Sequence, residues 1–297
     1  MKFKIRFVLI ISTVFILLTQ LSFAEGTKEG WQLELKKIAL NFTSTEVQNA
    51  EIYKTAGVSN ARLTSDSQTL IQGTLNFAAD YFAPKSFWSN TLLMEYGKTY
   101  IRPVGKDEVI NESADKILIT TDYTYRLWTI TNFLGGFEAG PFVNIGYETE
   151  FNPQENNSLK KIVRGMIGAK LFEGKYLKSL YVSAVGEADY TYQPETSRFA
   201  METGFKLENP IRDGLKVVSF GYYRNYMKES TERITDLQYE LELDVRLDVM
   251  LYKNLSLAPF VNYYTAQAKH FSGTGTNLYT GLSLTYSTFF KKAEITE

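Results

Sequence analysis

An uninterrupted alternation of apolar and polar residues between positions 237 and 251 dominates the pattern of the chain. Every odd position from Leu237 to Leu251 is apolar or aromatic, whereas the even positions from Gln238 to Asp248 are Gln, Glu, Glu, Asp, Arg and Asp. A period of two indicates a β-strand with one apolar and one polar face. At the usual rise per residue this strand would extend about 50 Å. It is therefore longer than the roughly 9–11 residues with which a strand crosses a membrane.

The same alternation recurs along the chain and predicts twelve strands. Tyr and Phe are abundant, at 20 each, and Pro is scarce, at 7, a composition that favours strands. The expected strands cover residues 31–43, 69–82, 87–100, 115–127, 137–151, 159–172, 177–192, 198–208, 215–227, 234–252, 255–267 and 277–290.

The connections between these strands alternate between short and long. Short links are expected at 83–86, 173–176, 209–214 and 253–254, with 128–136 as a looser member, and longer polar loops at 44–68, 101–114, 152–158, 193–197, 228–233 and 268–276. Short turns at one end and long loops at the other are typical of bacterial outer-membrane barrels. The chain is therefore expected to be all-β, a transmembrane up-and-down antiparallel β-barrel of about twelve strands over residues 25–290. A short periplasmic tail, 291–297, would follow.

In such a barrel the apolar face of each strand meets lipid and the polar face lines a lumen. Leu241, Leu243 and Val245 would lie on the outer wall. A tight turn at 173–176 would pair Phe172 with Leu177 and place Arg164 one diagonal step from Glu187, within reach of an ion pair. The residues expected to line the lumen are Arg164, Lys170, Glu187, Asp189, Arg198, Glu202, Lys206, Glu240, Glu242, Asp244, Arg246 and Asp248.

Aromatic residues collect near the ends of the expected strands. Amphipathic rings suit the headgroup level of a membrane, so these residues would form two girdles. The girdle on the side of the short turns would include Phe82, Phe87, Trp88, Trp128, Phe172, Tyr176, Tyr252 and Phe290.

The first 24 residues have the pattern of a secretory signal peptide. Basic residues precede the apolar run Phe7–Leu18, and Ser22 and Ala24 place small side chains before a cleavage site. The alternative is an uncleaved anchor, but the apolar run is shorter than the roughly 20 residues of a spanning helix. Residues 1–24 are therefore expected to be removed.

Charge and cysteine content narrow the range of functions. Removal of residues 1–24 takes away three basic residues, so the 32 Lys+Arg fall to 29 against 33 Asp+Glu. This acidic balance argues against nucleic acid as a partner. The chain has no cysteine, which excludes thiol catalysis and thiolate metal sites. We expect no cofactor.

The last expected strand carries a pattern of its own, Tyr279-x-Gly281-x-x-Leu284-x-Tyr286. It resembles the C-terminal assembly signal of Gram-negative outer-membrane β-barrel proteins. The resemblance implies that the barrel assembly machinery reads this strand and that the protein contacts outer-membrane lipid and lipopolysaccharide. The tail after Phe290 departs from the pattern, since many such proteins end at the aromatic residue. The segment Phe87–Leu127 also looks like uncharacterised barrel families, which imply no known activity.

Two groups of residues could carry chemistry. The single histidine stands in His270-x-Ser272, which is similar to the catalytic pair of outer-membrane phospholipase A; Asn277 or Asn262 could orient the imidazole. The rest of that family's motif does not match, so we do not expect an enzyme. A row of carboxylates on 240, 242, 244 and 248 could attract Ca²⁺ or Mg²⁺, but it also fits a lumen wall neutralised by neighbouring strands. We expect no metal site.

These patterns favour a narrow channel for small polar solutes or ions. The alternative is a structural or surface-interaction barrel with a blocked lumen, in which the loop 44–68 does the outward work. A phospholipase-like enzyme at His270 and Ser272 is a third hypothesis, and a soluble β-rich periplasmic protein is the alternative fold.

Overall fold

The computed structural model describes residues 27–55, 63, 69–101, 109–131, 133, 135–153, 158–231, 233, 236–270 and 272–296. The expected signal peptide, residues 1–24, lies outside the described residues. No helix within the described part of the chain is long and apolar enough to span a membrane.

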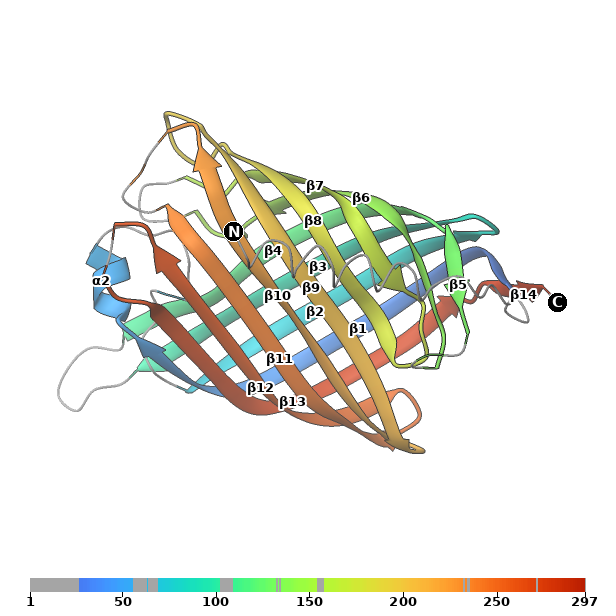
Figure 1. Ribbon diagram of the computed structural model, residues 1–297. Coiled ribbons are helices and arrows are strands. Elements are labelled where there is room, and N and C mark those ends of the chain that lie inside the picture. The colour runs from blue at the N-terminus through green and yellow to red at the C-terminus, as the bar shows by residue number, and fades with distance from the viewer. Residues whose placement is uncertain are drawn as a thin grey trace.

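Twelve long strands within the described residues form a closed antiparallel barrel (Figure 1). Each pairs with the next along the chain, and β13 pairs back with β1. The first six are β1 (Thr27–Gln48), β2 (Thr69–Ala83), β3 (Ser86–Ile101), β4 (Val109–Tyr125), β6 (Phe137–Thr149) and β7 (Ile162–Phe172). The other six are β8 (Leu177–Asp189), β9 (Thr196–Arg212), β10 (Leu215–Glu229), β11 (Leu237–Tyr252), β12 (Leu255–Ala268) and β13 (Gly275–Lys291).

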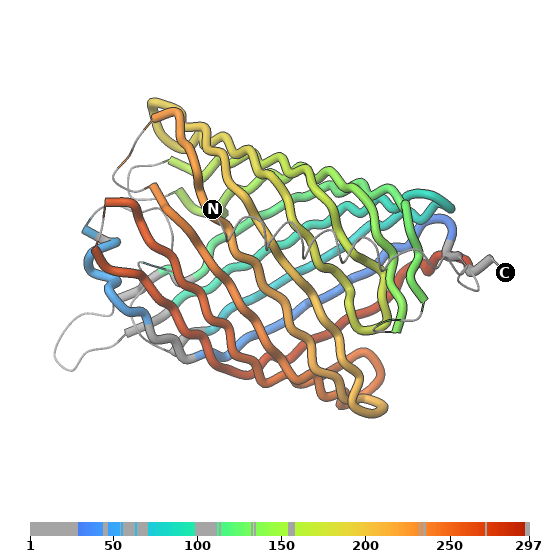
Figure 2. The backbone as a smooth tube through the Cα atoms, viewed as in Figure 1, coloured from blue at the N-terminus to red at the C-terminus, as the bar shows by residue number. Residues whose placement is uncertain are grey.

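Three short elements lie at the ends of the barrel. The helix α2 (Ala50–Thr55) sits at one end, in the connection from β1 to β2. At the opposite end, β14 (Glu294–Thr296) pairs with Thr27–Glu29 of β1. Figure 2 shows the strands of the barrel running between these two ends. The two ends of the described chain thus share one rim. This rim also carries the short turns and is called the periplasmic end here; the end with α2 is the outer end.

The expected class of fold, a twelve-strand barrel, is confirmed, but two of the expected links are wrong. The link 128–136 contains β5 (Trp128–Ile130), which pairs with the start of β6. The Arg126 N–H donates to the carbonyl of Lys85, at 2.9 Å. The strand resumes at Trp128. The interruption at Arg126 and Leu127 therefore made one long strand look like a strand and a loop.

The link 209–214 is also shorter than expected. Strand β9 continues to Arg212, and only Asp213 and Gly214 form the turn. The pairing of β9 with β10 shifts register beside Pro210, where Lys216 pairs with Pro210 and Leu215 with Arg212. Because proline has no N–H to donate to a neighbouring strand, it is tolerated in a sheet at such bulges. Gly214 has a φ of 75°, which a glycine adopts at little cost in a tight turn.

The pairing of β7 with β8 differs from the expected register by two residues. Phe172 pairs with Ser179 rather than Leu177, so the turn takes up two more residues than expected. Arg164 therefore lies directly opposite Glu187 instead of on a diagonal. The predicted contact is confirmed, with 2.7 Å between Arg164 Nη2 and Glu187 Oε2.

The outer wall of the barrel is apolar. Leu243 and Val245 are exposed on it as expected, and Ile167 is 64% exposed. Soluble proteins rarely expose a continuous apolar surface of this extent. Lipid also accounts for closure, because unpaired backbone groups are costly in hydrocarbon. The chain is therefore a Gram-negative outer-membrane barrel whose wall contacts membrane lipid.

The aromatic girdle at the periplasmic end is only partly as expected. Trp31, Tyr81 and Trp88 cluster on the outer wall, with 5.1 Å between the ring centroids of Trp31 and Tyr81. By contrast, Phe82, Phe87 and Phe172 point into the lumen and pack on one another there. The alternation assigns Phe82 and Phe172 to the polar face. It therefore predicted the side on which these rings lie better than their position near a strand end did.

Closure of the barrel between β13 and β1 depends on a small residue at 281. A Cβ atom on Gly281 would lie 2.0 Å from the carbonyl oxygen of Phe42 on β1. We expect Gly281→Ala to force this seam apart and destabilise the barrel by about 1–3 kcal/mol, the usual cost of overpacking. The measurement is the urea midpoint of the refolded protein in detergent.

Gly165 provides the matched control for this substitution. A Cβ atom there would meet no atom within 4 Å, so Gly165→Ala should leave the midpoint nearly unchanged. Equal effects of the two substitutions would contradict a tight seam at Gly281.

Candidate functional site

The lumen holds two cavities in series. The outer cavity, of about 390 Å³, extends to residues of the outer loops such as Tyr192 and Arg233. The periplasmic cavity, of about 1290 Å³, extends to the turns that contain Asp213 and Lys253. The five side chains that line both cavities mark the level at which they meet: Lys37, Thr74, Glu95, Phe220 and Arg246.

The structure places the twelve expected lumen residues on the inside of the barrel. Most of those from the outer half line the outer cavity: Arg164, Glu187, Asp189, Arg198, Glu240, Glu242, Asp244 and Arg246. Lys170, Lys206 and Asp248 line the periplasmic cavity. Glu202 lines neither, because it is buried between Tyr181 and Arg224.

Arg224 on β10 joins two neighbouring strands inside the barrel. Its guanidinium donates to Glu202 on β9 and, at 2.6 Å, to Glu240 on β11. Tyr226 and Tyr264 also donate to Glu240, at 3.1 and 2.8 Å. All of these groups are buried. Because buried charges are costly unless paired and hydrogen-bonded, the complete set of partners is what allows them to lie inside the barrel.

A second cluster of charges lies beside the first in the outer half. Arg198 binds Glu187 at 2.9 Å, Asp189 at 3.3 Å and Asp236 at 3.0 Å. Arg164 shares Glu187 and lies 3.6 Å from Glu148. Pairing by arginine therefore runs around the wall from β6 to β11. It narrows the outer cavity and neutralises most of its charge.

The row of carboxylates on β11 is divided among different partners. Glu240 belongs to Arg224, and Asp248 lies 3.1 Å from Arg246. The Asn262 amide donates to both Glu242 and Asp244, at 3.0 and 3.3 Å. Within the described residues, no group of three or more acidic or histidine side chains converges as a metal site would require.

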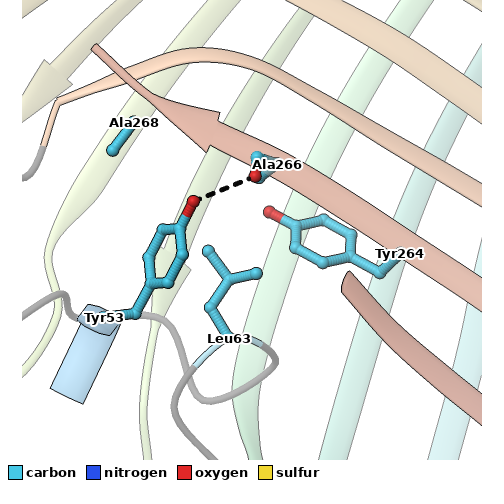
Figure 3. Close-up of a cluster of buried hydrophobic side chains, with 5 residues drawn as sticks. All are labelled: Tyr53, Leu63, Tyr264, Ala266 and Ala268. Carbon is cyan, nitrogen blue, oxygen red and sulfur yellow. Dashed lines mark hydrogen bonds between the residues drawn. The ribbon is translucent and has the colours of Figure 1, made fainter. Parts of the chain in front are cut away.

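The connection from β1 to β2 is anchored at the outer mouth. Tyr53 on α2 and Leu63 are both fully buried against Tyr264, Ala266 and Ala268 of β12 (Figure 3). The Tyr53 hydroxyl donates to the carbonyls of Ala266 and Gly273, at 3.2 and 2.9 Å, and accepts from the Gly275 N–H at 3.0 Å. The helix is thereby held across the hairpin of β12 and β13.

Sequence reasoning missed this anchor, although a signal for it exists. A Cβ atom on Gly275 would lie 2.9 Å from both Leu63 and the Tyr53 ring. The run Gly273-Thr274-Gly275 therefore marks a place where another segment approaches the backbone closely. Sequence reasoning treated these glycines only as loop residues.

The residues of the phospholipase hypothesis lie in different surroundings. His270 and Ser272 are exposed in the turn after β12, and Phe271 lies outside the described residues. Of the two expected orienting residues, Asn262 donates to carboxylates in the lumen and Asn277 is buried on β13.

The assembly pattern lies on β13, which pairs with both β12 and β1. Leu284 and Tyr286 are exposed on the outer wall, and Tyr279 is buried toward the lumen. Gly281 lies at the seam described above.

One family profile matches part of the chain. Residues 54–140 match the profile of a family described as a protein of unknown function (DUF3078). No curated protein matches.

Solved structures that are similar to this chain include outer-membrane proteins. The translocator domain of the autotransporter NalP from Neisseria meningitidis is 10% identical, with a TM-score of 0.34, over 93% of this chain and 92% of that one. Outer membrane phospholipase A from Escherichia coli is 9% identical, with a TM-score of 0.45, over 84% and 92%. The outer membrane channel DcaP of Acinetobacter baumannii is 8% identical, with a TM-score of 0.42, over 91% and 99%. The fold assignment rests on the pairing of this chain's own strands.

Removal of the Arg224 guanidinium should destabilise the barrel. Arg224→Met would leave Glu202 and Glu240 as buried carboxylates without a cation, which typically costs about 3–5 kcal/mol. We expect a lower urea midpoint for this variant in detergent. Lys228→Met removes a charge from the exposed end of the same strand and should have little effect. An unchanged midpoint for Arg224→Met would show that water replaces the arginine.

Proposed function

We propose that the barrel is a narrow channel for small polar solutes or ions across the outer membrane. The observation that carries this proposal is the pair of charged cavities in series, which meet at the level of Lys37, Glu95 and Arg246. Charged side chains that line a narrow passage are the usual means of selecting what passes.

The size of the barrel supports a narrow passage. Eight-stranded barrels are filled by side chains, whereas barrels of about 16–18 strands leave an open aqueous channel. Twelve strands lie between these limits. The arginine pairs around Glu187 and Glu240 fill part of the lumen, and the two cavities are the space that remains.

Specific contacts also favour the alternative, a structural or surface-interaction barrel with a blocked lumen. Tyr53 holds α2 at the outer mouth, and the charge network crosses between strands in the outer half. In this alternative the outward loops would act as the functional surface. Conductance distinguishes the two functions.

The refolded protein should give small single-channel conductances in planar lipid bilayers. A narrow, charge-lined lumen predicts well-resolved steps, smaller than those of an open sixteen-stranded porin. Lys37→Ala, at the level where the cavities meet, should alter the conductance and its ion selectivity. Lys85→Ala, in the exposed turn from β2 to β3, should alter neither. A silent bilayer with fully folded protein would favour the blocked barrel.

Release of the anchor at the outer mouth should widen the path. Tyr53→Ala removes three hydrogen bonds and a buried ring from the contact with β12 and β13. We expect a larger conductance or a higher open probability than in the unmodified protein. Ile52→Ala, at an exposed position of the same helix, serves as the control. Equal conductance for Tyr53→Ala would show that α2 does not limit passage.

We further propose that β13 is read by the barrel assembly machinery through Tyr279, Gly281, Leu284 and Tyr286, and that the outer wall and loops meet lipopolysaccharide. The proposal includes no catalysis at His270 and Ser272. Support for the assembly role comes from the pattern of the strand and from its place as the last barrel strand, which closes on β1.

A further inference from the structure

Four lysines converge in the periplasmic cavity from opposite walls. Lys178, Lys206 and Lys216 come from the neighbouring strands β8, β9 and β10, and Lys36 comes from β1, on the other side of the barrel. We call these four residues the lysine cluster. The cavity that they line is the larger of the two, at about 1290 Å³.

The carboxylate of Glu208 lies among three of these lysines. The Oε1 atom of Glu208 lies 3.3 Å from the Nζ of Lys206, and its Oε2 atom lies 3.6 Å from the Nζ of Lys216. Lys178 interacts with the same carboxylate at longer range, and within the described residues it has no other ion-pair partner. Lys216 also lies 4.0 Å from Asp248, which in turn lies 3.1 Å from Arg246. Two carboxylates thus face three lysines and an arginine, so this side of the cavity keeps a positive potential.

Lys36 adds to this potential from across the cavity. It lies 3.7 Å from Asp80, yet it is close enough to Lys206 for the two ammonium groups to repel each other. The side chains of Lys206 and Lys216 are 44% and 45% exposed. They therefore face the water of the cavity and can turn toward a ligand between the two walls.

The charge of the lumen also changes along its axis. Eight acidic and six basic residues line the outer cavity alone, whereas seven acidic and eight basic residues line the periplasmic cavity alone. The shared level adds two basic residues and one acidic residue. The lining of the outer half is thus more negative than that of the periplasmic half, which favours an anion in the periplasmic half.

We propose that the lysine cluster is a binding site for a multivalent oxyanion of the phosphate type. Lysine binds phosphate as a compact point charge with three donors, and several lysines from two walls suit an anion with several oxygens. The site lies inside the barrel, where lipid headgroups do not reach, so its ligand is a free solute that enters from the periplasmic mouth. The inference that a channel conducts such an anion rests on the proposed function. The inference that the anion binds here rests on the cavity alone.

Substitution of Glu208 should change the affinity for the anion in the opposite direction to substitution of a lysine. In the free protein its carboxylate occupies the place of the anion among the lysines, so an incoming anion must compete with it. Neutralising Glu208 should strengthen binding, whereas neutralising a lysine should weaken it. A purely structural role of these ion pairs would not produce opposite effects on affinity.

The experiment is calorimetric titration of the full-length refolded protein, in non-ionic detergent at low salt, with inorganic phosphate. Acetate serves as the monovalent comparison. Lys206→Gln and Lys216→Gln should each weaken phosphate binding about two- to fivefold, the range for partly exposed ion pairs. Glu208→Gln should strengthen binding by a similar factor. Raising the salt should weaken binding in the unmodified protein through screening.

Lys85→Gln is the matched control, because it makes the same change in charge at the same rim but outside the cavity. Folding of every variant is checked by its heat-dependent migration on a gel. Absence of phosphate binding, or weaker binding by Glu208→Gln, would overturn the proposal. Conductance without phosphate binding would support the channel and overturn the binding site. Phosphate binding without conductance would support the binding site and not the channel.

Discussion

The requirement that every backbone N–H and C=O be paired within hydrocarbon governs this structure. A sheet with a free edge cannot meet it, because unpaired groups at the edge would face lipid. Pairing of β13 with β1 removes that edge. The tilt of the strands (Figure 1) and the enclosed lumen follow from this closure. Gly281 shows how tight the seam is, since its backbone packs directly against that of Phe42.

Closure creates an interior that the chain must fill with polar groups. The two halves of the lumen do this differently. In the outer half, arginines hold carboxylates in buried, multiply bonded pairs around Glu187 and Glu240. In the periplasmic half, the half-exposed side chains of Lys206 and Lys216 share the carboxylate of Glu208. Arginine's planar, multidentate group suits a fixed structural pair, whereas lysine's flexible point charge suits exchange between partners. The outer half thus holds buried, fixed ion pairs, and the periplasmic half holds more exposed ones.

Most of the fold could be predicted from the sequence because one face of a membrane strand contacts lipid and the other contacts the polar lumen. Apolar and polar residues therefore alternate with a strict period of two. The twelve strands and the inner face of β11 followed from that alternation. The β7–β8 register could not be predicted, because a turn's conformation sets it and Gly174 bonds across to Leu177. The continuation of the strand as β5 was missed because the interruption at Arg126 and Leu127 breaks the period that defines the strand. The two carboxylate partners of Arg224 could not be predicted either. Alternation gives the face on which a side chain lies, but not the rotamer that decides which neighbour it contacts.

The anchor at the outer mouth had no periodic signal at all. Tyr53 and Leu63 lie in a connection whose pattern fits neither period, and their burial depends on a partner more than 200 residues away in the chain. Only the glycines of the facing hairpin hinted at a close approach.

The short ribbon of β14 with the first residues of β1 gives the chain an almost circular course. Thr27–Glu29 and Glu294–Thr296 are joined by main-chain pairing just beyond the seam. Fraying of a sheet begins at the ends of its outermost strands. Here the start of β1 pairs with β14 next to the point where the pairing of β1 with β13 begins. The ribbon thus adds main-chain pairing between the first and last parts of the chain at the end of the seam where separation of β1 from β13 would begin.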